Sequence, residues 1–255
     1  MRTITIANQK GGTGKSTTAS ALGAGLRKRG YRVLFVDLDG QGNLSYSMGA
    51  DCSGSASTGS MEVLTRVISA SEAIQHTASG DIIASSPALA GANTSITQVG
   101  KEYRLKEALE PLSEAYDFCV VDTPPALGIV TVNALTASQS LIIPATADIY
   151  SLQGIGQLSL TLQAVQRYCN PGLRVEGILI TSYSSRSIIS RDMADSLRET
   201  ASAMGTKVFD TSIRICSSVR EAQTMMEDLY TYAPKSNATK DYDSLIDELL
   251  EGWRS

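Results

Sequence analysis

Residues 9 to 16 read Gln9-Lys10-Gly11-Gly12-Thr13-Gly14-Lys15-Ser16, and this stretch decides the fold. It lies between an apolar run typical of a buried strand, Thr3 to Ala7, and a helical stretch, Thr17 to Arg29. Glycines at such a junction let successive backbone N–H groups point at phosphate oxygens, while a lysine neutralises the β and γ phosphates and a hydroxyl reaches Mg²⁺. Lys15 and Ser16 fit these two roles. The stretch therefore predicts a phosphate-binding loop for a nucleotide.

Short apolar runs alternate with helical stretches along the rest of the chain. The expected strands are Thr3 to Ala7, Val33 to Val36, Asp81 to Ala84, Phe118 to Val121, Leu141 to Pro144 and Val175 to Thr181. The expected helices are Thr17 to Arg29, Lys101 to Ala115, Ile129 to Ala137, Gly154 to Tyr168, Ser190 to Met204 and about Thr239 to Glu251. This alternation predicts an α/β fold with a mostly parallel, twisted sheet and helices on both faces.

The chain is expected to form one domain over residues 1–255. A Ser- and Gly-rich patch, Asp51 to Ser60, resembles a surface loop more than a domain linker, and no repeat of 20 to 50 residues is visible. Hydrophobic residues make up 42% and charged residues 19% of the chain, which suits a globular protein with a sizeable core. The composition thus argues against disorder.

Several classes of protein are disfavoured by composition. No stretch approaches the roughly 18 apolar residues of a membrane span, and the start lacks the apolar region of a secretion signal, so we expect a cytoplasmic protein. His76 is the only histidine, which excludes multi-histidine metal sites and disfavours Ser-His-Asp or Cys-His catalysis. The four cysteines are widely separated, so we interpret them as reduced thiols.

Charge is distributed unevenly along the chain. The formal net charge is −4, yet residues 160 to 220 hold eight basic against five acidic side chains, a local balance of +3. The remainder of the chain therefore carries −7. Binding of nucleic acid through bulk positive charge is excluded, whereas binding through a local basic face is not.

The motifs of the chain resemble those of the ParA/MinD family of deviant Walker A ATPases, and most closely the small ParA (Soj-type) partition ATPases. Gln9 stands where a common P-loop has glycine, but Lys10 to Ser16 matches the deviant pattern K-G-G-x-G-K-[ST]. Residues 36–43 (VDLDGQGN) are similar to VDxDPQGN, residues 121–125 (VDTPP) to the Walker B segment DxPP, and residues 151–158 (SLQGIGQL) to ALEGLxQL. The resemblance covers residues 1 to about 182.

This resemblance implies a P-loop NTPase fold, ATP and Mg²⁺ as cofactors, and a set of site residues. The residues expected to bind the nucleotide are Gly11, Gly12, Thr13, Gly14, Lys15, Ser16, Thr17 and, through the adenine, Pro234. Those expected near Mg²⁺ are Ser16, Asp37 and Asp122. The catalytic residues would be Lys10, Lys15 and Asp39. Asp39 matches the acid that positions the attacking water, and for Asp37 the alternative is a structural role at the end of a strand.

Lys10 would act on a second copy of the chain. In the family the additional lysine reaches across a dimer interface to the partner's nucleotide, where it supplies positive charge to the γ-phosphoryl oxygens. The resemblance therefore implies a homodimer that forms with ATP, and slow ATP hydrolysis by the chain when it is not dimerised. In the segment of residues 36–43, Gly40 replaces the family's proline, which loosens the backbone there. Asp39, Gln41 and Asn43 of the same segment are retained.

Small ParA proteins bind double-stranded DNA without sequence preference, and the basic residues of the C-terminal part would do so here. The candidates are Arg191, Arg214, Arg220, Lys235 and Lys240. The alternative for each is an ordinary solvated cation. Residues 213–222 (IRICSSVREA) resemble the family's IPRNVRLSEA only loosely, and Ser218 stands where the family has a DNA-binding arginine, with Arg220 two positions away. Thr239 or Asn237 is expected to cap the last helix.

The function implied is ATP-dependent segregation of plasmid or chromosomal DNA, with hydrolysis stimulated by a ParB-like centromere-binding protein and the protein located on the nucleoid. An alternative within the family is the positioning of a non-DNA cargo on the nucleoid. A MinD-like membrane role needs a basic amphipathic C-terminal helix, whereas residues 244–255 are acidic, so no membrane partner is expected. An iron-sulfur role is disfavoured because Cys119 is better explained by core packing.

Overall fold

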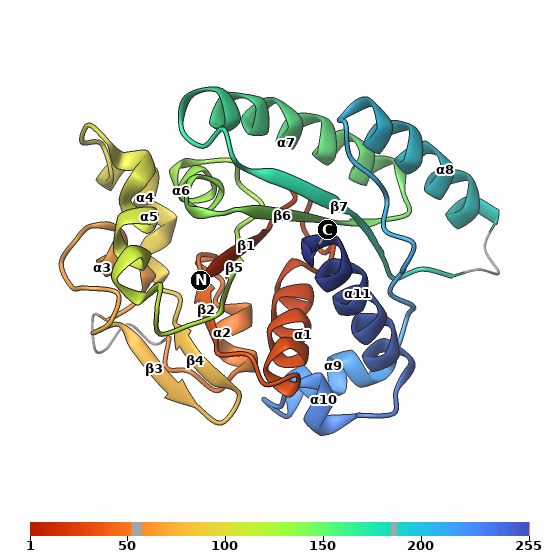
Figure 1. Ribbon diagram of the computed structural model, residues 1–255, viewed down its shortest axis with the longest axis horizontal. Coiled ribbons are helices and arrows are strands. Elements are labelled where there is room, and N and C mark those ends of the chain that lie inside the picture. Colours follow the sequence, from red (N-terminus) through yellow and green to blue (C-terminus); the bar gives the residue numbers. More distant parts are fainter. Residues whose placement is uncertain (53–57, 185–187, 255) are drawn as a thin grey trace.

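The computed structural model describes residues 1–52, 58–184 and 188–254, with the side chains of residues 188–191 outside the described part. Its centre is a seven-stranded sheet with the order β3-β4-β2-β5-β1-β6-β7 (Figure 1). The strands are β1 Arg2–Ile6, β2 Val33–Asp37, β3 Ile74–Thr77, β4 Gly80–Ile83, β5 Phe118–Asp122, β6 Ser140–Thr146 and β7 Arg174–Thr181. Every neighbouring pair is parallel except β3 and β4. The predicted α/β fold is confirmed.

Helices cover both faces of this sheet (Figure 1). They are α1 Lys15–Lys28, α2 Asn43–Ser47, α3 Ser60–Leu64, α4 Ala92–Ser95, α5 Arg104–Leu109, α6 Ile129–Ala137, α7 Ile149–Tyr168, α8 Ile188–Ala203, α9 Ser217–Thr224, α10 Leu229–Tyr232 and α11 Asn237–Arg254. Short 3₁₀ turns are η1 Pro87–Gly91, η2 Lys101–Tyr103 and η3 Glu110–Leu112. Within the described residues, no helix combines the length and apolarity needed to cross a bilayer.

The two faces of the sheet form separate parts of the core. Ile4 and Ile6 of β1 pack with α1, α10 and α11 on one face. On the other face, Val121 of β5 packs with α3, α5 and α6, and Ile143 of β6 packs with α7 and α8. Because both faces are buried, β2, β5 and β6 contain apolar runs and β1 alternates isoleucine with buried threonine, which is why these strands could be recognised in the sequence.

Four local expectations differ from the structure. The edge strand β3 was not predicted, because its sequence IQHT has no apolar run and its side chains are only partly buried. The helix expected over Lys101 to Ala115 is instead η2, α5 and η3, because Pro111 lacks the N–H that a continuing helix needs. In the loop expected over Asp51 to Ser60, residues 53–57 lie outside the described part, and Ser60 already begins α3.

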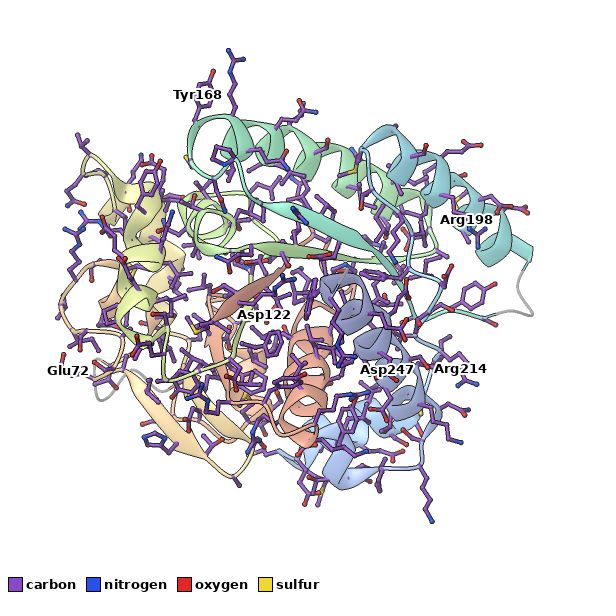
Figure 2. The ribbon with its side chains drawn as sticks, viewed as in Figure 1. Glu72, Asp122, Tyr168, Arg198, Arg214 and Asp247 are labelled. Carbon is purple, nitrogen blue, oxygen red and sulfur yellow. The ribbon has the colours of Figure 1, made fainter. Side chains whose placement is uncertain are left out.

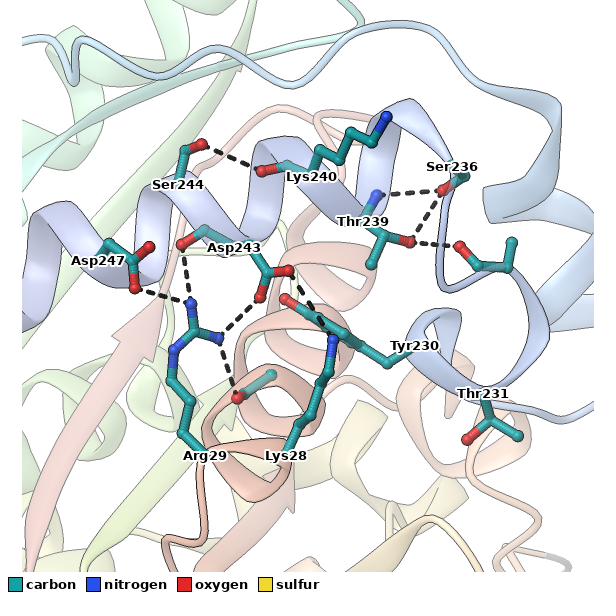
Figure 3. A network of polar contacts seen from close by, with 12 residues as sticks. Lys28, Arg29, Tyr230, Thr231, Ser236, Thr239, Lys240, Asp243, Ser244 and Asp247 are labelled. Atoms are coloured by element: carbon teal, nitrogen blue, oxygen red, sulfur yellow. Dashed lines mark hydrogen bonds and ion pairs between the residues drawn. The ribbon is translucent and has the colours of Figure 1, made fainter.

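The fourth difference concerns the start of α11. The capping oxygen belongs to Ser236, whose hydroxyl accepts a hydrogen bond from the Thr239 amide at 3.1 Å (Figure 3). The hydroxyl of Thr239 donates instead to the Ala233 carbonyl at 2.6 Å. The expectation that Thr239 or Asn237 caps this helix was therefore wrong, and the cap lies one residue earlier than Asn237.

The C-terminal end of α1 is fixed to α11 by both charge and packing (Figure 3). Arg29, directly after α1, donates to Asp243 and Asp247 at 2.8 Å each. Next to this network, Gly25 lets the two helices approach closely, since a Cβ atom added there would lie 2.3 Å from Ile246 Cδ1 and 2.4 Å from the Tyr230 hydroxyl. The position of α1, and therefore of the loop that precedes it, depends on this contact.

Substitution Gly25→Ala should destabilise the fold. The added methyl group has no space between Ile246 and Tyr230, so we expect a loss of about 1–3 kcal/mol in the free energy of unfolding, measured by chemical denaturation. Gly156 on the exposed side of α7 is the control, because nothing lies within 4 Å of a Cβ there. Gly156→Ala should stabilise by a few tenths to about 1 kcal/mol. Equal effects of the two substitutions would contradict the assigned packing.

Candidate functional site

The carboxyl ends of the three central strands meet at one edge of the sheet, and the loop of residues 9–14 follows one of them. Ile6 at the end of β1 pairs with Asp122 at the end of β5, and Asp122 pairs with Asp37 at the end of β2. Ligands of open α/β sheets bind outside such strand ends. Gly12 and Gly14 have φ values of 75° and 82°, which favour glycine, so the loop can bring its backbone N–H groups to the start of α1.

A cavity of about 670 Å³ opens at this edge. Its inner wall consists of the loop and the start of α1: Gly11, Gly12, Gly14, Lys15, Ser16 and Thr17. Two other walls come from the segment after β2 and from α9. The structure thus brings together six of the seven loop residues expected to bind the nucleotide. Thr13 is not part of the lining, since it is buried with its carbonyl accepting a hydrogen bond from Thr181 at 2.9 Å.

The Lys15 ammonium is buried beside the loop it belongs to. It donates to the Lys10 carbonyl at 3.1 Å, and the residue is only 7% exposed. Burial lowers the pKa of Lys15, while the charges of Asp122 and Asp39 act to raise it. A buried cation in a cavity lined by a glycine-rich loop is placed to attract the phosphate groups of a nucleotide.

Asp122 is a fully buried carboxylate of the site and lies near the centre of the molecule (Figure 2). Its Oδ1 accepts a hydrogen bond from the Thr123 amide at 3.0 Å, while Oδ2 has no hydrogen-bond partner among the described residues. Burial and the charge of Asp37 raise the pKa of Asp122 well above its usual range, against the opposing influence of Ser16 and Lys15. A further cation bound next to Asp122 would favour its ionised form.

This donor set fits Mg²⁺ bound together with phosphate. Mg²⁺ prefers oxygen ligands and usually keeps several of its waters, so one hydroxyl and one carboxylate suffice on the protein side. Ser16 and the unpartnered Oδ2 of Asp122 supply these groups. No cluster of three or more His, Cys, Asp or Glu side chains suited to a metal occurs in the described part of the chain. The site therefore fits a metal that arrives with a nucleotide better than a metal held by protein ligands alone.

Asp37 holds the segment after β2 in place. Its Oδ1 accepts from the Asp39 amide at 3.0 Å, and its Oδ2 accepts from the amide and hydroxyl of Ser45 at 2.8 and 2.7 Å. Burial raises the pKa of Asp37 to about 6, although these hydrogen bonds act to lower it. Both carboxylate oxygens of Asp37 are therefore used to hold the chain after β2, which is the structural role that the sequence offered as the alternative. A contact of Asp37 with Mg²⁺ stays a prediction.

Asp39 faces the cavity from this same segment. Its Oδ1 accepts from the Gln41 amide at 3.0 Å, and the side chain makes no other hydrogen bond within the described residues. One carboxylate oxygen is therefore available to a water molecule in the cavity, as a residue that orients a nucleophile requires. At Gly40 an added Cβ would make ordinary contacts of 3.7 Å with Leu89 and Ala90, so the glycine is not required sterically.

Lys10 is held within its own chain. Its ammonium forms an ion pair with Asp148, the residue that caps α7, and donates to the Thr146 hydroxyl at 3.0 Å. Gly154 of α7 allows this close approach, since a Cβ there would lie 3.2 Å from the Lys10 amide. Any contact of Lys10 with a second protomer requires this ion pair to open.

The five cations expected to bind DNA are in different environments. Arg214 is neutralised by Asp241, to which its guanidinium donates at 2.6 to 3.1 Å, whereas Lys235 and Lys240 are exposed without an ion pair in the described part. Arg220 lines the nucleotide cavity. The side chain of Arg191 lies outside the described residues. Pro234, expected near the adenine, is exposed in the loop before α11 and is not part of the cavity lining.

Sequence reasoning missed α9 as a wall of the cavity. Gln223 and Thr224 line it together with Arg220, and the Gln223 amide donates to the Thr17 hydroxyl at 2.9 Å. This contact joins residues 206 positions apart, so no local pattern predicts it. Helix α9 has only eight residues, and Val219 and Ala222 are its only apolar side chains, so the sequence did not indicate a helix there. Only the loose match of this segment to the family segment indicated a functional role.

Comparisons with known proteins agree with this site. A family model described as "AAA domain" matches residues 1–175. The chain is 35% identical over 249 residues to the sporulation initiation inhibitor protein Soj of Bacillus subtilis, covering 96% of this chain and 97% of that protein. It is 36% identical to the chromosome-partitioning ATPase Soj of Thermus thermophilus, covering 98% and 96% respectively.

Solved structures show the same fold with nucleotide bound. A structure named cobyrinic acid a,c-diamide synthase, from Mycobacterium smegmatis with an ATP analogue and magnesium, has a TM-score of 0.87 and 34% identity, covering all of this chain and 96% of that one. The ATP complex of a McdA variant from Cyanothece has a TM-score of 0.86 and 25% identity, covering 98% and 96%.

The burial of Asp122 and its unpartnered Oδ2 predict a gain of stability when its charge is removed. A carboxyl group with a higher pKa in the folded than in the unfolded chain destabilises the fold wherever it is ionised. Asp122→Asn should therefore raise the unfolding free energy of the ligand-free chain by about 1–3 kcal/mol at pH 8. The gain should shrink as the pH falls below about 4, because the carboxyl group then becomes protonated in the unfolded chain as well.

Asp117→Asn is the control with the opposite sign. Hydrogen bonds from Arg32 lower the pKa of Asp117 to about 2, so its charged form stabilises the fold at neutral pH. This substitution should lower stability at pH 7, and the loss should disappear as the pH falls through about 2. Thermal unfolding at several pH values measures both. Asp122→Asn destabilising the ligand-free chain at pH 8 would contradict the assigned environment.

Proposed function

The chain belongs to the family of ParA and Soj partition ATPases, and from this premise we propose that it segregates DNA by alternating between an ATP-bound dimer and a monomer. The observation that carries the proposal is the cavity lined by the glycine-rich loop and the buried Lys15, in a chain similar to Soj over nearly its full length. Residues 1–255 act in this proposal as one ATPase domain.

The site residues divide the work of hydrolysis. The loop amides and Lys15 bind the phosphates, and Asp39 orients the water that attacks the γ-phosphorus. Ser16 and Asp122 would hold Mg²⁺, which would supply positive charge to the phosphate oxygens of the nucleotide. Asp37 keeps Asp39 in place through the hydrogen bond from the Asp39 amide. The products are ADP and phosphate, and the consequence is a change of conformational state.

Exposed apolar side chains support a dimer that covers the cavity. Tyr46 lines the cavity and is 53% exposed, and Met225, directly after the lining residue Thr224, is 60% exposed. Tyr150, whose ring lies 6.0 Å from the Lys10 ammonium, is 67% exposed. Apolar groups gathered around a polar site are typical of an interface. In the dimer, Lys10 leaves Asp148 and reaches the nucleotide of the second copy.

Non-specific DNA binding follows from dimerisation. Each protomer contributes few exposed cations, and two protomers double the number of phosphate contacts on one face, which lets an acidic chain bind DNA. Lys235 and Lys240 are the strongest candidates, because their charges have no acidic partner in the described part. Arg214 contributes less, because Asp241 neutralises it.

The stimulating partner in this proposal is a ParB-like protein, and the protein resides in the cytoplasm on the nucleoid. Positioning of a non-DNA cargo on the nucleoid would use the same ATPase and the same DNA face. The two functions differ in whether hydrolysis is stimulated by a centromere-binding protein. No membrane partner is part of the proposal.

DNA binding with ATP and with ADP over a series of salt concentrations tests the proposal. We expect binding at low salt with ATP, little binding with ADP, and a steep loss of affinity as salt increases, because phosphate contacts release counterions. Equal absence of binding with both nucleotides at low salt would overturn the DNA-segregation function.

A double substitution then tests whether Lys235 and Lys240 contact DNA. Lys235→Ala with Lys240→Ala should reduce the salt slope by about 2 per protomer, while ATP binding is retained. Lys106→Ala on α5 removes an exposed lysine far from these residues in the sequence and should leave the slope unchanged. A slope that stays unchanged in the double variant would show that other residues contact DNA.

Lys10→Ala should separate binding from stimulated hydrolysis. Lys10 contacts Asp148 and Thr146 rather than the cavity, so ATP affinity should stay within a few-fold of wild type. Stimulated turnover should fall to the basal level, because the cation supplied to the partner's γ-phosphate is lost. Phosphate release measured with DNA and the stimulating protein checks this. Full stimulated turnover in the variant would refute the role of Lys10 across the dimer.

A further inference from the structure

Helix α9 is positioned directly against the phosphate-binding end of α1. The Gln223 amide donates to the Thr17 hydroxyl at 2.9 Å, and Thr17 lies in the first turn of α1, next to Ser16. Helix α9 also contacts α2 on the other side of the cavity. The first N–H groups of a helix, together with its dipole, bind phosphate. Helix α9 therefore borders the position that phosphate groups occupy.

The face that α9 turns toward the cavity includes Arg220. Arg220, Gln223 and Thr224 are three and four positions apart, so they lie on one side of the helix, and all three line the cavity. Ala222, on another side, is buried against the protein. Because Gln223 is fixed to Thr17, the rotation of α9 about its axis is set, and it directs the Arg220 side to the cavity.

The guanidinium of Arg220 has no bonding partner in the described part of the chain. Its side chain makes no hydrogen bond or ion pair there, and only its backbone carbonyl accepts a bond, from the Thr224 hydroxyl at 2.8 Å. Two other arginines of the C-terminal region are neutralised: Arg214 pairs with Asp241, and Arg198 pairs with Asp195. An unpaired guanidinium at the edge of a phosphate cavity is available for bidentate binding of phosphate oxygens.

We propose that Arg220 binds the phosphate chain of the nucleotide and thereby couples α9 to nucleotide occupancy. This inference rests on the proposed function, because it takes the ligand to be a nucleoside di- or triphosphate. It assigns Arg220 to the ATP site, in place of the DNA contact expected from the sequence. In the family segment IPRNVRLSEA the corresponding position is the serine before Glu-Ala, so the arginine is a feature of this chain.

The coupling follows from the two anchors of α9. One anchor is the Gln223 to Thr17 hydrogen bond, which exists without ligand. The second is the contact between Arg220 and phosphate, which exists only when nucleotide is bound. Bound nucleotide therefore fixes α9 at both Arg220 and Gln223, which are one helical turn apart. The exposed Met225, which directly follows the helix, is then fixed in position as well. The position of this apolar group thus depends on whether the cavity is filled.

Nucleotide affinities of Arg220→Ala and Arg220→Lys test the proposal, with calorimetric titration of ATP, ADP and adenosine. We expect Arg220→Ala to weaken ATP and ADP by about ten- to a hundredfold, the effect of a lost hydrogen bond to a charged group. Adenosine binding should change less than threefold, because it has no phosphate. Arg220→Lys should fall between wild type and Arg220→Ala, since lysine keeps the charge but not the planar fork.

Arg198→Ala is the matched control, because it removes a guanidinium on α8 that does not line the cavity (Figure 2). Its nucleotide affinity should equal that of the wild type. The second measurement is DNA affinity at saturating ATP. Arg220→Ala should bind DNA with the same affinity as the wild type. Thermal unfolding without ligand confirms that the exposed substitution leaves the fold intact.

Wild-type ATP affinity in Arg220→Ala, together with weakened DNA binding, would overturn the proposal and assign Arg220 to the DNA face. An equal loss for adenosine, ADP and ATP would also overturn it, since the contact would then lie outside the phosphate chain. Failure of the proposed function gives a different result. In that case the wild-type chain itself binds no ATP, and Lys15→Ala has no effect on titration with any of the three ligands.

Discussion

The site depends on the burial of acidic groups next to a single buried lysine. Asp37 and Asp122 pair across neighbouring strands, Asp39 follows two residues after Asp37, and Lys15 is the buried cation among them. Charges of the same sign in a dry environment repel one another and lose their hydration. The raised pKa values of Asp37 and Asp122 show that the ligand-free site tends to keep protons. A bound cation would therefore stabilise the ionised form of these carboxylates.

This constraint links the fold to the function. The parallel sheet places the ends of β1, β2 and β5 side by side, and the tight loop after β1 brings Lys15 and Ser16 to the same edge. Asp37 uses both of its oxygens to hold the segment that carries Asp39, so the position of Asp39 at the cavity depends on the hydrogen bonds of Asp37. In the proposed function Asp39 orients the attacking water, so Asp37 would act on hydrolysis through the position of Asp39.

The fold and the inner wall of the site were predictable because their signals are local. The loop of residues 9–16 is continuous in the sequence, and the central strands are apolar because both faces of the sheet are buried. The strand β3 was missed because an exposed edge strand needs no apolar run. The contacts of Gln223 with Thr17 and of Lys10 with Asp148 join distant residues, so only the folded chain reveals them. The position of Arg220 at the cavity likewise depends on the folded chain, since the sequence alone places it among the candidate DNA-binding cations.

Proton release on binding of Mg²⁺ and ATP tests the burial of these carboxyl groups most directly. Titration calorimetry between pH 6 and 8, in buffers with different heats of ionisation, counts the protons. We expect the wild-type chain to release protons from the buried carboxyl groups when Mg²⁺ and ATP bind, with the number falling as the pH rises. Asp122→Asn should release fewer. Binding heats that are independent of the buffer at every pH, in both proteins, would contradict this expectation.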